Sequence, residues 1–212
     1  MKNEQENSYE KLRVGGLTFH TRPNSWDKNV VNSVVSGQEY ALPPLPIGAK
    51  VLDIGAHIGS FSVLMASKGY SVTSVEPSPD NFNLLLLNMK ENGFKAQLHW
   101  GGVCDRSCEV AVQHVPENMG SSKTVKGTGV SCETLASYLP QGVLDLLKID
   151  CEGCEYAALK DIVENHSRIR AIVGEVHGSN APEFLRKLKP YYDIKLAPSK
   201  AASAILFLAV HL

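Results

Sequence analysis

Two kinds of hydrophobic pattern alternate along most of the chain. Short, mostly apolar runs are followed by segments in which apolar residues recur every three or four positions. The first pattern is typical of buried strands, and the second is typical of helices that bury one face. Their alternation predicts an α/β fold with a mostly parallel sheet that helices cover on both faces.

Seven of the apolar runs are predicted to be strands of this sheet. Helices separate the early runs, so those strands are expected to be parallel. Only a short segment of small residues separates the last two runs, which is too short for a crossover helix and predicts a C-terminal antiparallel hairpin. The seven runs are 50–54, 71–75, 96–100, 144–149, 171–175, 192–196 and 204–210.

The helices have recognisable ends. Gly69 and Gly93 each follow an apolar stripe, in the position where glycine commonly ends a helix. Ser78 followed by Pro79 is typical of a helix N-terminus. Between the third and fourth strands, residues 109–130 predict an inserted β-hairpin.

The length and composition describe one ordinary folded domain. The chain has 212 residues, of which 43% are hydrophobic and 20% charged, so the bulk of it is not expected to be disordered. We predict an N-terminal extension or lid at 1–48 and a main domain at 49–212. No repeat or low-complexity segment is visible.

The charge balance argues against partners that bind mainly through charge. Lysine and arginine (21) nearly cancel aspartate and glutamate (22), for a net charge of -1. A nucleic-acid or anionic-membrane partner is therefore not expected. The longest apolar run, at 204–210, is too short for a membrane span, and the N-terminus lacks the apolar core of a signal peptide. These features predict a cytoplasmic protein.

The five cysteines are predicted to be reduced thiols. An odd number without an export signal fits thiols better than a disulfide framework. Cys151 and Cys154 have the spacing of a zinc site, but no histidine lies at a neighbouring ligand spacing. We therefore expect both to be small, buried, apolar residues.

The segment VLDIGAHIG carries the first candidate chemistry. Asp53 lies near the end of the first strand, and Gly55 and Gly59 follow where the chain must turn sharply. Glu76 ends the second strand, where a carboxylate can accept hydrogen bonds from ribose hydroxyls. His57 occupies the position where a dinucleotide-binding loop needs glycine, which favours S-adenosylmethionine over a pyrophosphate cofactor. The alternative is a glycine turn that only packs helix on strand.

Carboxylates gather at the end of the fourth strand, within LLKIDCEGCEY. Asp150 and Glu152 lie at the strand edge where open α/β sheets bind ligands. Each also has a structural alternative, Asp150 as a helix cap and Glu152 as a carboxylate in the first helical turn. Glu175 and His177 follow the fifth strand and should reach the same edge.

The chain resembles the FkbM-type methyltransferase family. The resemblance rests on VLDIGAHIG, VEPSPDNFNLLLLNMKENG and LLKIDCEGCEY, with weaker matches at Trp26-Asp27, 37–40 and 130–135. Cys151 and Cys154 replace the valine and alanine common in the family, and His57 replaces asparagine. The resemblance implies a Rossmann-like class I methyltransferase fold, whose seven-stranded sheet ends in an antiparallel hairpin.

The resemblance also implies a cofactor, a reaction and site residues. The cofactor is S-adenosylmethionine, the product is S-adenosylhomocysteine, and the substrate is a hydroxyl group of a small molecule, sugar or lipid. His177 is a candidate base, with Asp150 or Glu152 orienting it or accepting the proton itself. No residue is assigned to a metal, although the paired carboxylates offer a divalent cation a place. The implied catalytic residues are Asp150, Glu152 and His177, and the implied cofactor contacts are Asp53, Gly55, Ala56, Gly59, Glu76, Pro77, Val103, Asp105 and Asp150.

Three other functions are also compatible with the sequence. An NAD-dependent oxidoreductase would also use such a sheet, and a catalytically silent protein would keep only the cofactor site. A nucleic-acid methyltransferase would be expected to carry a basic face, which this chain lacks. Asp105 has its own alternative as a turn residue. We expect the substrate to contact the N-terminal segment and the turn around 118–122.

Overall fold

The computed structural model describes residues 9–113, 123–199 and 204–212. The strands are β1 (Glu10–Val14), β2 (Leu17–Thr21), β3 (Lys50–Ile54), β4 (Ser71–Glu76), β5 (Gln97–Trp100), β6 (Gly102–Val103), β7 (Cys108–Gln113), β8 (Lys123–Lys126), β9 (Val130–Glu133), β10 (Leu146–Ile149), β11 (Ala171–His177), β12 (Tyr192–Pro198) and β13 (Ala204–His211). The helices are α1 (Asp27–Val35), α2 (Ser60–Ser67), α3 (Pro79–Glu91), α4 (Leu135–Tyr138), α5 (Cys154–Glu164) and α6 (Ala181–Leu188), with a short 3₁₀ helix at His166–Arg168.

The central sheet confirms the predicted topology. Its seven strands follow the order β12-β13-β11-β10-β3-β4-β5. The five strands from β11 to β5 are parallel, and β13 pairs antiparallel with both β11 and β12. The carboxyl ends of β3, β4, β10 and β11 therefore meet at one edge, where ligands bind in open α/β sheets.

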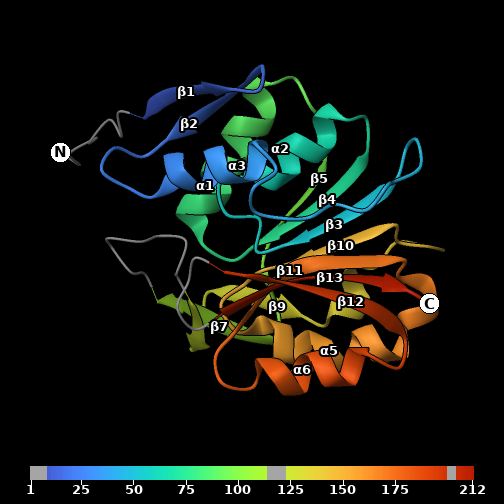
Figure 1. Cartoon of the computed structure of the whole chain (residues 1–212). Helices are drawn as coiled ribbons and strands as arrows, with labels where there is room; N and C mark the ends of the chain where they lie inside the picture. Colours follow the sequence, from blue (N-terminus) through green and yellow to red (C-terminus); the bar gives the residue numbers. More distant parts are fainter. Residues whose placement is uncertain (1–8, 114–122, 200–203) are drawn as a thin grey trace.

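Helices cover both faces of this sheet. Figure 1 shows α1, α2 and α3 on one side and α5 and α6 on the other. Successive strand residues serve opposite layers, because side chains alternate across a strand. Val51 packs in the cluster that contains Phe61 of α2, whereas Leu52 packs in the cluster that contains Phe184 of α6. Each such side chain, when fully buried, contributes about 1.5–3 kcal/mol.

The helix ends agree with the sequence. Ser78 is the N-cap of α3, and its hydroxyl accepts a hydrogen bond from the Asn81 N–H. Gly69 and Gly93 follow α2 and α3 with φ of +79° and +70°, which is the left-handed conformation expected beyond a helix C-terminus.

The predicted insertion belongs to a second, smaller sheet. Strands β7 and β8 pair antiparallel as expected, but β9 and β6 extend the pair into four strands in the order β6-β9-β7-β8. The predicted turn and substrate contact at 118–122 lie outside the described residues. No helix in the described part of the chain is long and apolar enough to cross a membrane.

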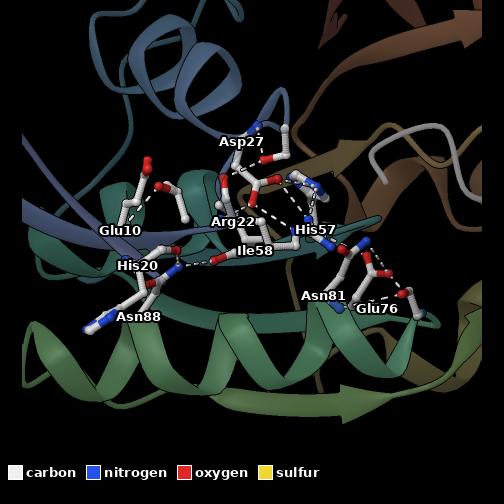
Figure 2. A network of polar contacts seen from close by, with 12 residues as sticks. Glu10, His20, Arg22, Asp27, His57, Ile58, Glu76, Asn81 and Asn88 are labelled. Atoms are coloured by element: carbon white, nitrogen blue, oxygen red, sulfur yellow. Dashed lines mark hydrogen bonds and ion pairs between the residues drawn. The ribbon is translucent and has the colours of Figure 1, made fainter. Parts of the chain in front are cut away.

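The N-terminal segment is more structured than the sequence indicated. Strands β1 and β2 form a hairpin beside α3 (Figure 1), and Phe19 is fully buried. Asn88 of α3 and Asn92, the C-cap of this helix, bind the backbone of β2. Asn88 accepts from the His20 N–H at 2.6 Å and donates to the His20 and Ile58 carbonyls at 3.2 and 2.8 Å (Figure 2). These bonds tie the hairpin to the main domain.

Candidate functional site

The glycine turn after β3 sits tightly against neighbouring backbone. Gly55 has a φ of +76°, and a Cβ on it would lie 1.9 Å from the Asp150 carbonyl oxygen. A Cβ on Gly59, which is the N-cap of α2, would lie 2.6 Å from a methyl carbon of Leu85. Close packing thus disfavours any larger residue at both positions. Gly55 and Ala56 also line the main cavity, which is described below.

Asp53 lies beneath this turn in an ion pair with Lys148. The two charged atoms are 3.1 Å apart, and Asp53 also accepts a 2.6 Å hydrogen bond from Ser62. Lys148, on β10, donates to the Gly55 carbonyl at 2.6 Å. Burial lowers the pKa of Lys148, but Asp53 and Asp150 raise it by more, so the lysine remains charged. Sequence reasoning selected Asp53 and missed its partner.

Glu76 connects the turn to the start of α3. Its carboxylate accepts from the His57 and Ser78 N–H groups at 2.8 and 2.9 Å and from the Asn81 amide at 3.3 Å (Figure 2). Burial raises the pKa of Glu76, and these hydrogen bonds oppose the rise. A carboxylate has about four acceptor positions, so a fourth is left, although Glu76 is only 5% exposed and is not among the residues that line the main cavity.

Three further predicted cofactor contacts, Pro77, Val103 and Asp105, differ in their exposure. Pro77 follows Glu76 directly, and the Pro77 carbonyl accepts a 3.0 Å hydrogen bond from the Trp100 indole. Val103 is buried at the end of β6. Asp105 lies in an exposed bend after β6, which fits its alternative as a turn residue.

His57 links the glycine turn to the N-terminal segment, a role that the sequence did not reveal. Its Nε2 lies 3.2 Å from the Arg22 guanidinium and 3.5 Å from Asp27 (Figure 2). Arg22 also forms a two-bond pair with Asp27, at 2.8 and 2.9 Å. Burial and the Arg22 charge outweigh Asp27 and lower the pKa of His57 to about 4. Burial would raise the pKa of Asp27, but Arg22 and His57 hold it below its usual value.

The buried, neutral His57 should make the protein less stable in mild acid. Between its unfolded pKa of about 6.5 and its folded pKa of about 4, the unfolded chain binds the extra proton. Stability due to this site is present above pH 6.5 and is lost as the pH falls through that window. The free energy of unfolding of the wild type should fall between pH 7 and pH 4.5, and about 2–3 kcal/mol of this fall should be absent in His57→Asn. Urea unfolding at both pH values measures the difference.

Asparagine suits this comparison because it tolerates the positive φ of position 57, which is +53°. The exposed His99 provides the control, and His99→Gln should keep the wild-type pH dependence. Parallel pH profiles for wild type and His57→Asn would mean that His57 is not the group responsible.

A cavity of about 490 Å³ opens between the N-terminal segment and the carboxyl edge of the sheet. Tyr40 from the segment after α1 donates a 2.6 Å hydrogen bond to Asp150 Oδ2. The cavity is lined by the glycine turn and by four acidic or basic residues of the sheet edge, which are Lys148, Asp150, Glu175 and His177. Glu152, in the loop after β10, also lines it.

His177 is surrounded by carboxylates. Its Nδ1 lies 2.8 Å from Oε1 of the fully buried Glu155, and its Nε2 lies 3.6–3.9 Å from Glu175, Glu152 and Asp150. Burial lowers the pKa of His177, but the hydrogen bond with Glu155 and the nearby carboxylates of Glu175 and Asp150 raise it to about 11. A ring that already holds its proton is a poor base, so this arrangement favours a carboxylate as the base.

The same surroundings shift the pKa values of Asp150 and Glu175. Burial raises the pKa of Asp150 to about 6, against the opposing effect of Lys148. Burial alone would raise the pKa of Glu175, but His177 and Ser199 hold it below the usual value.

Helix α5 begins at Cys154 with Gly153 as its N-cap and no side-chain cap, so the alternative of Asp150 as a helix cap is wrong.

Cys151 and Cys154 form a disulfide, which corrects the prediction of reduced, apolar residues. The bond closes the loop that carries Glu152 and excludes a zinc site at this pair. An odd number of cysteines does not exclude a disulfide between two of them. The other three, Cys104, Cys108 and Cys132, are free thiols near the small sheet.

Removing this disulfide should have a modest cost. The chain-entropy relation gives about 2 kcal/mol for so short a loop. The double variant Cys151→Val, Cys154→Ala should therefore unfold at lower urea concentration than the oxidised protein. A thiol reductant should shift the wild type by a similar amount and leave the variant unchanged, whereas an unresponsive wild type would show that the bond does not form in solution.

The sequence matches the model of the methyltransferase FkbM domain over residues 53–195. This range contains the glycine turn, Glu76 and the Asp150 loop, and it ends within β12. None of the curated proteins compared with the chain matches it.

Several solved structures share the fold. The tRNA (uracil-54, C5)-methyltransferase of Pyrococcus abyssi, in complex with S-adenosyl-L-homocysteine, has a TM-score of 0.55 and 16% identity, covering 96% of this chain and 44% of its own. The 16S rRNA N2 G1207 methyltransferase of T. Thermophilus, with AdoMet and guanosine, has the same score and identity, covering 96% and 50%. A methyltransferase from Pyrococcus furiosus has a TM-score of 0.54 and 14% identity, covering 93% and 90%. The shared architecture confirms the class I methyltransferase fold.

Proposed function

The chain belongs to the FkbM methyltransferase family, and from this premise we propose that it transfers a methyl group from S-adenosylmethionine to a hydroxyl group of a small molecule. The observation that carries the proposal is the acidic cavity beside the glycine turn. The NAD-dependent oxidoreductase considered from the sequence does not fit this family.

The charges of the cavity suit a cationic cofactor better than a phosphorylated one. Asp150, Glu152 and Glu175 line it, while Lys148 is already paired with Asp53. A pyrophosphate beside these carboxylates would meet like charge, whereas a sulfonium and an ammonium group would be attracted. Gly55 and Ala56 would border the methionine end, and Glu76 keeps an acceptor position for a ribose hydroxyl.

The cavity also indicates the class of acceptor. Its volume of about 490 Å³, which the cofactor and the acceptor would share, falls within the range of small-molecule sites. The same carboxylates would repel the phosphates of a nucleic acid, and the net charge of -1 offers no compensating attraction. The RNA substrates named for the similar structures belong to those proteins. A neutral or cationic hydroxylated molecule is the acceptor that we propose.

The residues of the sheet edge would position the acceptor and remove its proton. When bound, S-adenosylmethionine supplies a methyl group on a cationic sulfur. Transfer requires the acceptor oxygen in line with the S–CH3 bond and a base for the hydroxyl proton. The O–CH3 bond forms as the S–CH3 bond breaks, and the proton passes to a carboxylate of the Asp150 and Glu152 pair. Tyr40 fixes Asp150 by hydrogen bonding.

Calorimetry with S-adenosylhomocysteine tests the cofactor. We expect binding to the wild type and none of NADH. Glu76→Ala should weaken the binding about 10- to 150-fold, since a charge-assisted hydrogen bond contributes about 1.5–3 kcal/mol. The exposed Glu183 of α6 is the matched control, and Glu183→Ala should bind as the wild type does. Absence of S-adenosylhomocysteine binding up to millimolar concentration would refute the cofactor, and unchanged affinity in Glu76→Ala would remove the ribose role.

A further inference from the structure

Three side chains at the sheet edge present one ligand atom each to a common point. Asp150, Glu175 and His177 have such atoms within 4.8 Å of one another. His177 Nε2 lies 3.6 Å from Glu175 Oε2 and 3.9 Å from Asp150 Oδ1, beyond ordinary hydrogen-bond length. Ligand atoms about 2.1 Å from one cation lie about 3.0 Å apart when adjacent and about 4.2 Å when opposite. The observed spacing therefore leaves room for a cation between the three atoms.

A second contact orients each of these side chains from outside the triad. Asp150 Oδ2 accepts from the Tyr40 hydroxyl, so its Oδ1 is the oxygen that faces His177. Glu175 Oε1 accepts from Ser199, so its Oε2 faces the same point. His177 Nδ1 donates to the fully buried Glu155, which leaves Nε2 directed inward, where a cation would displace the Nε2 proton on binding. Metal-binding histidines and carboxylates characteristically have such outer partners.

We propose that Asp150, Glu175 and His177 form a binding site for one divalent cation, with Mn²⁺ favoured over Mg²⁺. The imidazole nitrogen favours a transition metal, and the two carboxylates favour a hard cation, a combination that Mn²⁺ satisfies. The sequence placed these residues at one edge of the sheet but assigned no metal ligand. The triad lines the cavity, so water or an acceptor oxygen can complete the coordination.

The cation would serve the proposed methyl transfer, and this role rests on that proposed function. An acceptor hydroxyl bound to the cation loses its proton more readily, as metal-bound water does. Glu152 Oε1 lies 3.8 Å from His177 Nε2 and lines the same cavity, so it is placed to take the proton. The resulting oxygen then forms the O–CH3 bond while the S–CH3 bond breaks and leaves a neutral thioether. Asp150 is thereby a ligand and Glu152 the base.

Titration of MnCl₂ into the chelator-treated protein, followed by the electron paramagnetic resonance signal of free Mn²⁺, tests the site. We expect one ion per chain with a dissociation constant below about 100 µM. Glu175→Gln should weaken binding at least about 10-fold, and Tyr40→Phe should weaken it about 10-fold by releasing Asp150. Tyr40→Phe changes a single hydroxyl and keeps the ring, so it remains informative if Glu175→Gln fails to fold.

Glu39→Gln is the control for general attraction to an acidic cavity, because Glu39 also lines the cavity but lies outside the triad. It should bind Mn²⁺ as the wild type does. Equal losses in all three variants, or no Mn²⁺ binding, would overturn the site. Calorimetry of S-adenosylhomocysteine in excess chelator separates the two proposals. Cofactor binding without Mn²⁺ binding would refute only the metal site, and Mn²⁺ binding without cofactor binding would refute only the proposed function.

Discussion

Asp53→Asn is expected to lower the free energy of unfolding by about 3–5 kcal/mol, because it leaves the Lys148 ammonium buried without its counter-charge. Only 5% of the Lys148 side chain is exposed, so water cannot replace the lost carboxylate. Asparagine keeps the shape of the side chain and an oxygen for the Ser62 hydroxyl. Urea unfolding monitored by circular dichroism measures the loss.

A double variant separates charge from shape in this pair. Lys148→Met places an apolar chain of similar length at the same position, and adding it to Asp53→Asn removes the uncompensated charge. Replacing a buried ion pair by neutral residues is often nearly neutral. The double variant should therefore be more stable than Asp53→Asn alone. Losses that simply add would show that Lys148 is not the reason for the effect.

Gly55→Ala is expected to cost more than about 4 kcal/mol or to prevent folding. Its Cβ would meet the Asp150 carbonyl oxygen at 1.9 Å, and the nearest atoms are that backbone carbonyl and the Cys151 Cβ, neither of which is the movable end of a flexible side chain. The φ of +76° adds about 1–2 kcal/mol for any residue with a Cβ. Thermal and urea unfolding of the purified variant, or its failure to accumulate as folded protein, measures the effect.

Gly69→Ala isolates the steric part of this cost. Gly69 has nearly the same φ, +79°, but a Cβ there has no neighbour within 4 Å. We expect a loss of only about 1–2 kcal/mol for the backbone conformation. If the two variants were equally stable, the contact between Gly55 and the Asp150 backbone would be looser in solution than it is in the structure.

The sequence predicted the central sheet well because local patterns determine it. Buried parallel strands are continuous apolar runs, and glycine and proline marked the helix ends. The β1–β2 hairpin was missed although the sequence carries its signal, because apolar residues alternate with polar ones around Gly15-Gly16. Its place against α3 depends on contacts between residues far apart in the sequence, both apolar and polar. Asn88, for example, binds the backbone of His20, which lies 68 residues away in the sequence.

The candidate site likewise contains residues that the sequence could identify and residues that it could not. Residues at strand ends, such as Asp150 and His177, could be selected because the topology brings the carboxyl ends together. Tyr40 could not, because its hydrogen bond to Asp150 joins residues 110 apart, and its own segment carries no chemical signature. The role of His57 likewise depends on Arg22 and Asp27, which reach it from the hairpin and from α1.

The place of β13 in the sheet has a consequence for how the chain is made. Synthesis reaches β13 after every other described strand, yet β13 lies between β11 and β12. Until it emerges, β11 has an open edge on that side and β12 has no partner in the sheet. Unpaired edges of this kind invite association with other chains. The nascent chain should therefore be most prone to such association in the interval before β13 pairs with β11 and β12.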